Sequence, residues 1–221
     1  MYKLLDNYNN YIFDMDGTIV NSFNEVISAL EKACIKMNAE YLPEKLTTNL
    51  IGPPMKEIIK AVLKDAKNEE LIEKVANEYT NIYDNNQLDS SQAYPGVKQW
   101  LTKLHKEGKR LFIATNKPQI PTYRLVRKLN INFFTDIYTI DKYEFKNINK
   151  AQMIKEIIEK YSCEISSTLM IGDTVGDMTA AKENMVKSIG VLWGYGEDKI
   201  PLKAIADYVM STKDLLKIST N

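Results

Sequence analysis

Cysteine and histidine are scarce in this chain. Its 221 residues include only two cysteines, Cys34 and Cys163, and one histidine, His105. The cysteines are far apart and form no CxxC pair, which excludes a disulfide scaffold or a zinc cluster and predicts two buried thiols. His105 lies in a polar helix end, so a histidine-based catalytic triad is not expected.

The chain also lacks net charge and long apolar runs. Lys and Arg total 29, and Asp and Glu total 29, so no bulk field exists to hold nucleic acid or an anionic membrane. The first ten residues contain no apolar stretch typical of a signal peptide, and no run of about 18 apolar residues follows. We therefore expect a cytoplasmic monomer or homodimer that binds neither nucleic acid nor membrane.

Short apolar runs alternate with amphipathic patterns along most of the chain. The runs predict strands at 11–13, 110–114, 137–140, 168–171, 188–192 and 207–210, and the amphipathic patterns predict helices at 97–106, 117–129 and 150–161. A further helix is expected to end at Asn184 in a left-handed cap conformation. Buried strands separated by helices favour an α/β fold, with a Rossmann-like parallel sheet flanked by helices.

Residues 21–90 interrupt this alternation. Apolar stripes at 23–37, 55–63 and 71–82 predict three helices without an intervening strand. The polar run 84–87 predicts a solvated linker, and a turn at 94–96 would return the chain to the core. We predict a catalytic core of residues 1–20 and 91–221, with an all-helical cap domain of residues 21–90 inserted into it.

Polar side chains follow three of the predicted strands. They are Asp14 and Asp16, then Thr115 and Asn116, then Asp173 and Asp177. The carboxyl ends of parallel strands share one edge of the sheet, where ligands bind. Close carboxylate pairs repel each other by roughly 4 kcal/mol at an effective dielectric constant of 20, and a divalent cation would remove this cost. Oxygen ligands without Cys or His favour Mg²⁺.

A carboxylate held beside Mg²⁺ can attack phosphorus and form an aspartyl-phosphate, which divides hydrolysis into two steps. The transferred phosphoryl group then needs hydrogen-bond donors and positive charge. Thr115 and Asn116 can supply the donors, and Lys150 is the best-placed ammonium, with Lys146 as the second candidate. Gly17 would let the backbone approach a phosphate closely.

Four segments, in this order, resemble the motifs of the haloacid dehalogenase superfamily of phosphohydrolases. They are Phe13-Asp14-Met15-Asp16-Gly17-Thr18, Ala114-Thr115-Asn116-Lys117, Lys150 and Gly172-Asp173-Thr174-Val175-Gly176-Asp177. The insert is similar to the helical cap of that family. The segments 51–55 and 191–196 resemble its phosphoglycolate phosphatase and 5′-nucleotidase-like branch. One departure is Ala151, because this branch often has proline after the lysine.

The resemblance implies a role for each motif residue. Asp14 would be the nucleophile, and Asp16 would protonate the leaving oxygen and then activate water. The Mg²⁺ ligands would be Asp14, the backbone carbonyl of Asp16, and Asp173, with Asp177 ordering the metal site. Thr115 would hold the phosphoryl oxygens, Lys150 would offset charge, and Gly17, Thr18, Asn116 and the cap residue Gly52 would contact substrate.

These features together predict a Mg²⁺-dependent phosphatase acting on a small phosphorylated metabolite. A phosphomutase similar to β-phosphoglucomutase and an inorganic pyrophosphatase are alternatives on the same fold. A phospho-accepting module similar to a receiver domain is the non-enzymatic alternative, although its motifs stand in a different order. Taken singly, Asp173 and Thr115 could instead cap the helices that follow them.

Overall fold

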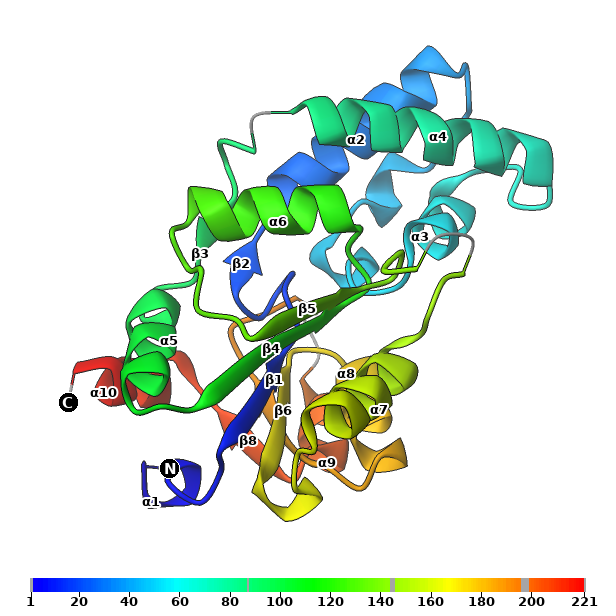
Figure 1. Cartoon of the computed structure of the whole chain (residues 1–221). Helices are drawn as coiled ribbons and strands as arrows, with labels where there is room; N and C mark the ends of the chain where they lie inside the picture. The colour runs from blue at the N-terminus through cyan, green and yellow to red at the C-terminus, as the bar shows by residue number, and fades with distance from the viewer. Residues whose placement is uncertain (1, 87, 144–145, 196–198, 221) are drawn as a thin grey trace.

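The structure is a computed structural model that describes residues 2–86, 88–143, 146–195 and 199–220 (Figure 1). Six parallel strands form one sheet in the order β5-β4-β1-β6-β7-β8. They are β1 (Asn10–Phe13), β4 (Arg110–Thr115), β5 (Asp136–Thr139), β6 (Thr168–Gly172), β7 (Lys187–Val191) and β8 (Tyr208–Met210). The predicted α/β fold with its parallel sheet is confirmed.

Helices cover both faces of this sheet. Alternate residues of β1 show the division, because Tyr11 and Phe13 belong to one apolar cluster and Ile12 to the other. The first cluster includes residues of α5 (Val97–Lys106) and α10 (Thr212–Thr220), and the second includes residues of α7 (Lys150–Tyr161) and α8 (Val175–Glu183). Burial on both faces explains why the strands lack a polar–apolar alternation. The short helices α1 (Tyr2–Leu5) and α9 (Ile200–Ile205) complete the core.

Helices also dominate the segment between β1 and α5. It contains α2 (Phe23–Lys36), short 3₁₀ turns at Pro43–Lys45 and Thr48–Leu50, α3 (Met55–Val62) and α4 (Glu69–Asn85). The segment begins and ends in a two-stranded antiparallel ribbon, in which β2 (Val20–Asn21), before α2, pairs with β3 (Gln92–Ala93), after α4. Figure 1 shows these helices above the sheet, with α6 (Gln119–Lys128) beside α4. The boundaries of a separate cap domain at 21 and 90 stay a prediction.

The predicted solvated linker at 84–87 is wrong in its first half. Asp84 and Asn85 form the last turn of α4, while Gln87 lies outside the described residues. The guanidinium of Arg124, on α6, donates to the backbone carbonyls of Asp84 and Asn86. A cation from α6 thus satisfies backbone carbonyls at the end of α4. The polar composition of residues 84–87 could not reveal this partner.

The predicted left-handed cap at Asn184 is also wrong. Asn184 has a φ of −99°, and the next residue, Met185, takes the left-handed conformation with a φ of 57°. The Asn184 amide instead donates to the backbone carbonyls of Ala180 and Ala151, at 2.9 and 3.0 Å. These two bonds tie the end of α8 to α7, which explains why Asn184 keeps a negative φ.

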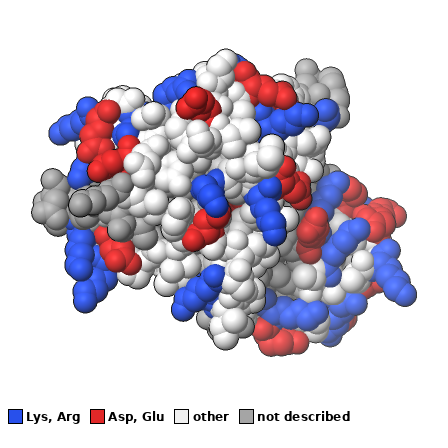
Figure 2. Space-filling view, turned by 90° about the horizontal axis from the view of Figure 1, so that it is seen from below, with Lys and Arg blue, Asp and Glu red and all other residues white. Residues whose placement is uncertain are grey.

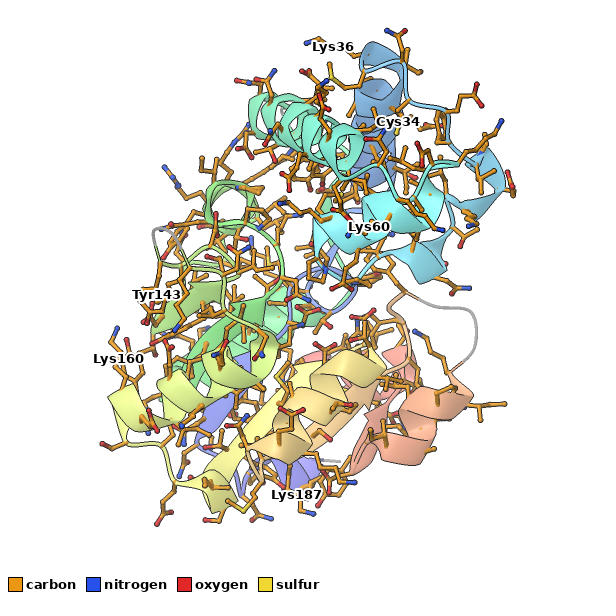
Figure 3. All side chains as sticks on the ribbon, turned by 90° about the vertical axis from the view of Figure 1, so that its right-hand side faces the viewer. Cys34, Lys36, Lys60, Tyr143, Lys160 and Lys187 are labelled. Carbon is orange, nitrogen blue, oxygen red and sulfur yellow. The ribbon has the colours of Figure 1, made fainter. Side chains whose placement is uncertain are left out.

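Charged side chains of both signs are interspersed on the surface seen in Figure 2. Exposed ion pairs occur on the insert, as between Lys60 and Glu69 at 2.7 Å, and on the core, as between Lys187 and Asp207 at 2.6 Å (Figure 3). Such pairs contribute little stability individually. Among the described residues, no helix combines the length and apolar character needed to cross a membrane.

Candidate active site

Three neighbouring strands carry the predicted site residues to one edge of the sheet. Asp14 follows β1, Thr115 ends β4, and Asp173 follows β6. The register pairs Phe13 of β1 with Ile113 on one side and Ile171 on the other, so the three strands end within two residues of the same level. The carboxyl edge therefore brings together side chains that are about 60 to 160 positions apart in the sequence, as expected of a parallel sheet.

A cluster of three buried carboxylates occupies this edge. Asp14, Asp173 and Asp177 each offer an oxygen within 4.8 Å of the others. The ammonium of Lys150 lies 2.8 Å from Asp14 and also contacts Asp177. Lys150 contacts two of the three carboxylates, and the charge of Lys199 also acts on Asp173, so three carboxylates face two lysines. The cluster retains an excess of negative charge that a cation would neutralise.

This environment changes the acidity of the cluster. Burial raises the pKa of Asp14 to about 7, with Asp177 adding to the rise and Lys150 opposing it. Burial, followed by the charges of Asp14 and Asp177, raises the pKa of Asp173 well above its ordinary value. Burial disfavours the charge of Lys150, but the two carboxylates that it contacts outweigh this effect and raise its pKa. Lys150 is therefore a permanent cation.

Neighbouring groups fix the orientation of the carboxylates. Asp173 accepts hydrogen bonds from the Thr18 hydroxyl at 3.0 Å and from the backbone N–H of Tyr195 at 2.8 Å. Asp177 accepts the N–H and hydroxyl of Thr174, at 3.0 and 2.7 Å, in a capping box at the start of α8. Thr174, not Asp173, is thus the N-cap of α8, and the capping alternative for Asp173 is wrong.

Gly17 allows the backbone to pack directly against Asp173. It has a φ of +84°, and a Cβ at this position would lie 2.2 Å from Oδ2 of Asp173. Gly194 approaches the same side chain from another loop, where a Cβ would lie 2.2 Å from Cβ of Asp173. Only glycine fits at such close approaches. This packing around buried hard oxygen donors, with no cysteine or histidine among them, fits Mg²⁺.

The Asp16 carboxylate does not belong to this cluster. It accepts the hydroxyl of Ser22, and both of its oxygens lie 3.1 Å from Nζ of Lys117. Lys117 also donates to the hydroxyl of Tyr83, on α4, at 2.7 Å, with Nζ 4.6 Å from the ring centroid. Neither Lys117 nor Tyr83 had a predicted role. The only available signal was the position of Lys117, directly after Thr115 and Asn116.

Between α4 and the strand ends lies a narrow pocket of about 50 Å³. Asp14, Asp16, Thr115, Asn116 and Lys117 line it from the core. The insert contributes mainly apolar and phenolic side chains, from Val26, Ile51, Met55, Ile58, Tyr79 and Tyr83. A wider cleft of about 630 Å³ also reaches Asn116, along with Lys150 and Asp177. Asp14 and Asp16 thus face a small pocket roofed by the insert.

The remaining predicted residues fall into two groups. Gly52 lines the pocket, and its carbonyl accepts the amide of Asn116 at 2.9 Å, which links insert and core. Gly17 and Thr18 instead lie against Asp173, so their predicted contact with substrate stays a prediction. The Thr115 hydroxyl accepts the N–H of Lys117 at 3.1 Å, whereas Pro118 is the N-cap of α6. Lys146 is exposed, in contrast to Lys150.

One residue that orients the acidic cluster had no predicted role of its own. Tyr195 supplies the N–H that orients Asp173, and its hydroxyl accepts the backbone N–H of Ser22 at 2.7 Å. Tyr195 belongs to the 191–196 segment, which carried only the resemblance to one branch of the family. The last residue of that segment, Gly196, lies outside the described residues. His105, by contrast, is exposed and stacks on Phe133. Cys34 and Cys163 are buried free thiols, as predicted.

Comparison with known proteins places the chain in a family. The model of the haloacid dehalogenase-like hydrolases matches residues 11–191. A phosphoglycolate phosphatase of Aquifex aeolicus is 28% identical over 214 residues, which cover 95% of this chain and 96% of the relative. A phosphoglycolate phosphatase of Agrobacterium fabrum is 29% identical over 188 residues, which cover 83% of this chain and 80% of the relative.

Solved structures share the fold. A haloacid dehalogenase-like hydrolase of Streptococcus pneumoniae superposes with a TM-score of 0.79 at 22% identity, covering 97% of this chain and 99% of the other. A predicted phosphoglycolate phosphatase of Haemophilus somnus gives a TM-score of 0.82 at 21% identity, covering 97% of each chain. The family match favours the enzymatic interpretation over the receiver-like alternative, because it runs from β1 to the end of β7 and includes all four motifs. The chain belongs to the haloacid dehalogenase-like hydrolases.

Proposed function

We propose that this hydrolase is a Mg²⁺-dependent phosphatase that cleaves a small phosphomonoester through an aspartyl-phosphate on Asp14. The observation that carries the proposal is the environment of Asp14. Its carboxylate is buried at the end of the central strand, pairs with Lys150 at 2.8 Å, and lies both in the acidic cluster and at the pocket wall. A nucleophilic carboxylate requires this combination of a nearby cation, restricted solvent and access to substrate.

In the first step, an oxygen of Asp14 attacks phosphorus and the ester P–O bond breaks. The leaving oxygen takes a proton from Asp16, which lines the same pocket. In the second step, Asp16 takes a proton from water, and the water oxygen attacks phosphorus. The P–O bond to Asp14 then breaks, so inorganic phosphate leaves and both carboxylates return to their initial states. One residue thus serves as acid and then as base.

The chain supplies the remaining groups for this chemistry. Asp14, Asp173 and Asp177, with the Asp16 carbonyl, would hold Mg²⁺, which supplies charge neutralisation for the phosphoryl oxygens. The buried Thr115 hydroxyl would donate to one of these oxygens, and Lys150 would balance charge on the nucleophile. The likeness to relatives named phosphoglycolate phosphatase makes phosphoglycolate the first ester to test.

The test is phosphate release from a panel of small phosphomonoesters, with Mg²⁺ and with EDTA. We expect metal-dependent release that Asp14→Asn lowers by at least about three orders of magnitude, as expected when a nucleophile is lost. Asp65→Asn, an exposed change on the insert, is the matched control and should leave release unchanged. The absence of release from every ester, or release that survives Asp14→Asn, would overturn the proposal.

A further inference from the structure

Lys117 is an unusual lysine. It is the only Lys or Arg among the buried residues that the structure describes, with 6% of its surface exposed. The Lys117 ammonium contacts both oxygens of Asp16 and the hydroxyl of Tyr83. Burial raises the pKa of Tyr83 well above its ordinary value, so this partner is a neutral phenol and Asp16 is the counter-ion. A buried ammonium that loses its counter-ion is strongly destabilised.

Asp16 has a second task if the proposed function is correct. It must reach the oxygen that leaves from phosphorus, give it a proton, and later take a proton from water. An oxygen in hydrogen-bond contact with Asp16 lies next to Lys117, because Nζ of Lys117 is 3.1 Å from both oxygens of the carboxylate. A group attached to the leaving oxygen by one carbon can therefore reach the ammonium when it lies on the Lys117 side of Asp16.

From this geometry, and resting on the phosphatase function proposed above, we propose that Lys117 binds an acidic group of the substrate. The favoured substrates are phosphate compounds whose leaving group carries an anion next to the leaving oxygen. A carboxylate on the adjacent carbon fits this description, and so does the second phosphate of pyrophosphate. The substrate anion would partner Lys117 while Asp16 turns to the leaving oxygen, so the buried charge would stay paired throughout turnover.

The rest of the pocket supports this assignment. Within the described lining, Lys117 is the only cation, and the insert contributes the side chains of Met55, Ile58 and Tyr79 around it. An anion buried among such groups requires a charged partner. The volume of about 50 Å³ suits a leaving group of a few atoms. Asp84 also lines the pocket and is the competing charge, so a cationic leaving group must be part of the test.

The experiment compares matched substrates on the full-length chain with Mg²⁺. The probes are 2-phosphoglycolate, its neutral amide, cationic 2-aminoethyl phosphate, and pyrophosphate. The measured quantity is the ratio of kcat/KM for each acidic probe to that for the amide. We expect this ratio to be large for the native chain and to fall by about a hundredfold in Lys117→Met, the effect typical of removing one partner of a buried charge pair. Lys60→Met, which removes an exposed lysine of α3, is the control and should keep the native ratio.

Ratios within one variant cancel any general loss of activity. If Lys117→Met is inactive, calorimetric titration in the Asp14→Asn background gives the same comparison as a ratio of dissociation constants. If only phosphoglycolate has a high ratio of kcat/KM to that of the amide, the anion next to the leaving oxygen is a carboxylate. If only pyrophosphate has a high ratio, that anion is a phosphate. Equal rates for acid and amide, preference for the cation, or an unchanged ratio in Lys117→Met would overturn the role of Lys117 while leaving the phosphatase intact. Only a failure of every probe would count against the phosphatase itself.

Discussion

At the scale of single residues, the site depends on close packing around its carboxylates as much as on the carboxylates themselves. Gly17 and Gly108 provide a test, because each has a positive φ but only Gly17 faces a neighbour. A Cβ at Gly17 would lie 2.2 Å from Asp173, whereas a Cβ at Gly108 would meet nothing within 4 Å. Both alanine variants carry the backbone strain of the left-handed region, about 1–2 kcal/mol.

We expect Gly17→Ala to weaken Mg²⁺ binding by about 10- to 100-fold, the range seen when groups that orient a metal ligand are altered. Gly108→Ala carries the backbone strain alone and should leave the Mg²⁺ affinity unchanged. The Mg²⁺ affinity of each variant is measured by titration with Mg²⁺, with heat or phosphate release as the signal. Equal affinities in the two variants would mean that Asp173 does not bind the metal.

The pKa of Asp14 predicts how the metal-free chain responds to pH. Burial raises this pKa to about 7 in the folded state, compared with about 3.9 in an unfolded chain. A group with a raised folded pKa contributes stability that is complete below the unfolded pKa and is lost as pH rises through the folded pKa. Without metal, the melting temperature of the native chain should therefore fall, relative to that of Asp14→Asn, as pH rises from about 4 to 7. If the difference in melting temperature between the native chain and Asp14→Asn stays constant across this range, the raised pKa of Asp14 is contradicted.

Sequence patterns predicted the acidic residues of the site better than the groups that hold them. Asp14, Asp173 and Asp177 stand in recognisable positions after strands, and the parallel sheet then brings them together. The contacts that orient them come from Thr18 and Tyr195, which are distant in sequence from Asp173. Lys117 and Tyr83 meet only because α4 packs over the strand ends. No local pattern records such pairings, which depend on the tertiary fold.

At the scale of elements, short apolar runs predicted every strand of the main sheet, and helical periodicity predicted the three helices of the insert. Such patterns follow from burial on both faces of the sheet and on one face of each helix. They failed where a tertiary partner determines the end of an element. The last turn of α4 is polar and resembles a linker, yet Arg124 of α6 binds its carbonyls. The ribbon of β2 and β3 was also missed, since two residues per strand are too few to form a pattern.

Arg124 should therefore stabilise the junction between insert and core. Its two bonds to the end of α4 are charge-assisted, and removing a charged hydrogen-bond donor costs about 1.5–3 kcal/mol. We expect Arg124→Ala to lower the melting temperature by about 3–10 °C in a chain of this size. Arg127→Ala, which removes an exposed arginine of the same helix, should lower it by much less. Thermal unfolding followed by circular dichroism makes this test, and equal shifts would mean that the Arg124 contact contributes nothing.

At the scale of the whole molecule, the acidic cluster lies at the end of the central strand, so its repulsion acts on the core of the fold. Asp14 extends β1, which lies between β4 and β6, and Asp173 extends β6. A bound Mg²⁺ would remove the repulsion only in the folded state, because the unfolded chain does not bring these residues together. Binding linked to folding in this way should raise the stability of the entire sheet.

At a Mg²⁺ concentration a hundred times its dissociation constant, the expected gain is about 2.7 kcal/mol. In a chain of this length such a gain raises the melting temperature by about 5–10 °C. The gain should increase with pH, since the metal competes with protons for Asp14 and Asp173, whose pKa values are both raised. Melting curves with and without Mg²⁺ at several pH values measure this dependence, and Asp173→Asn should abolish most of the shift. A metal-induced rise that persists in Asp173→Asn would place the stabilising ion elsewhere on the chain.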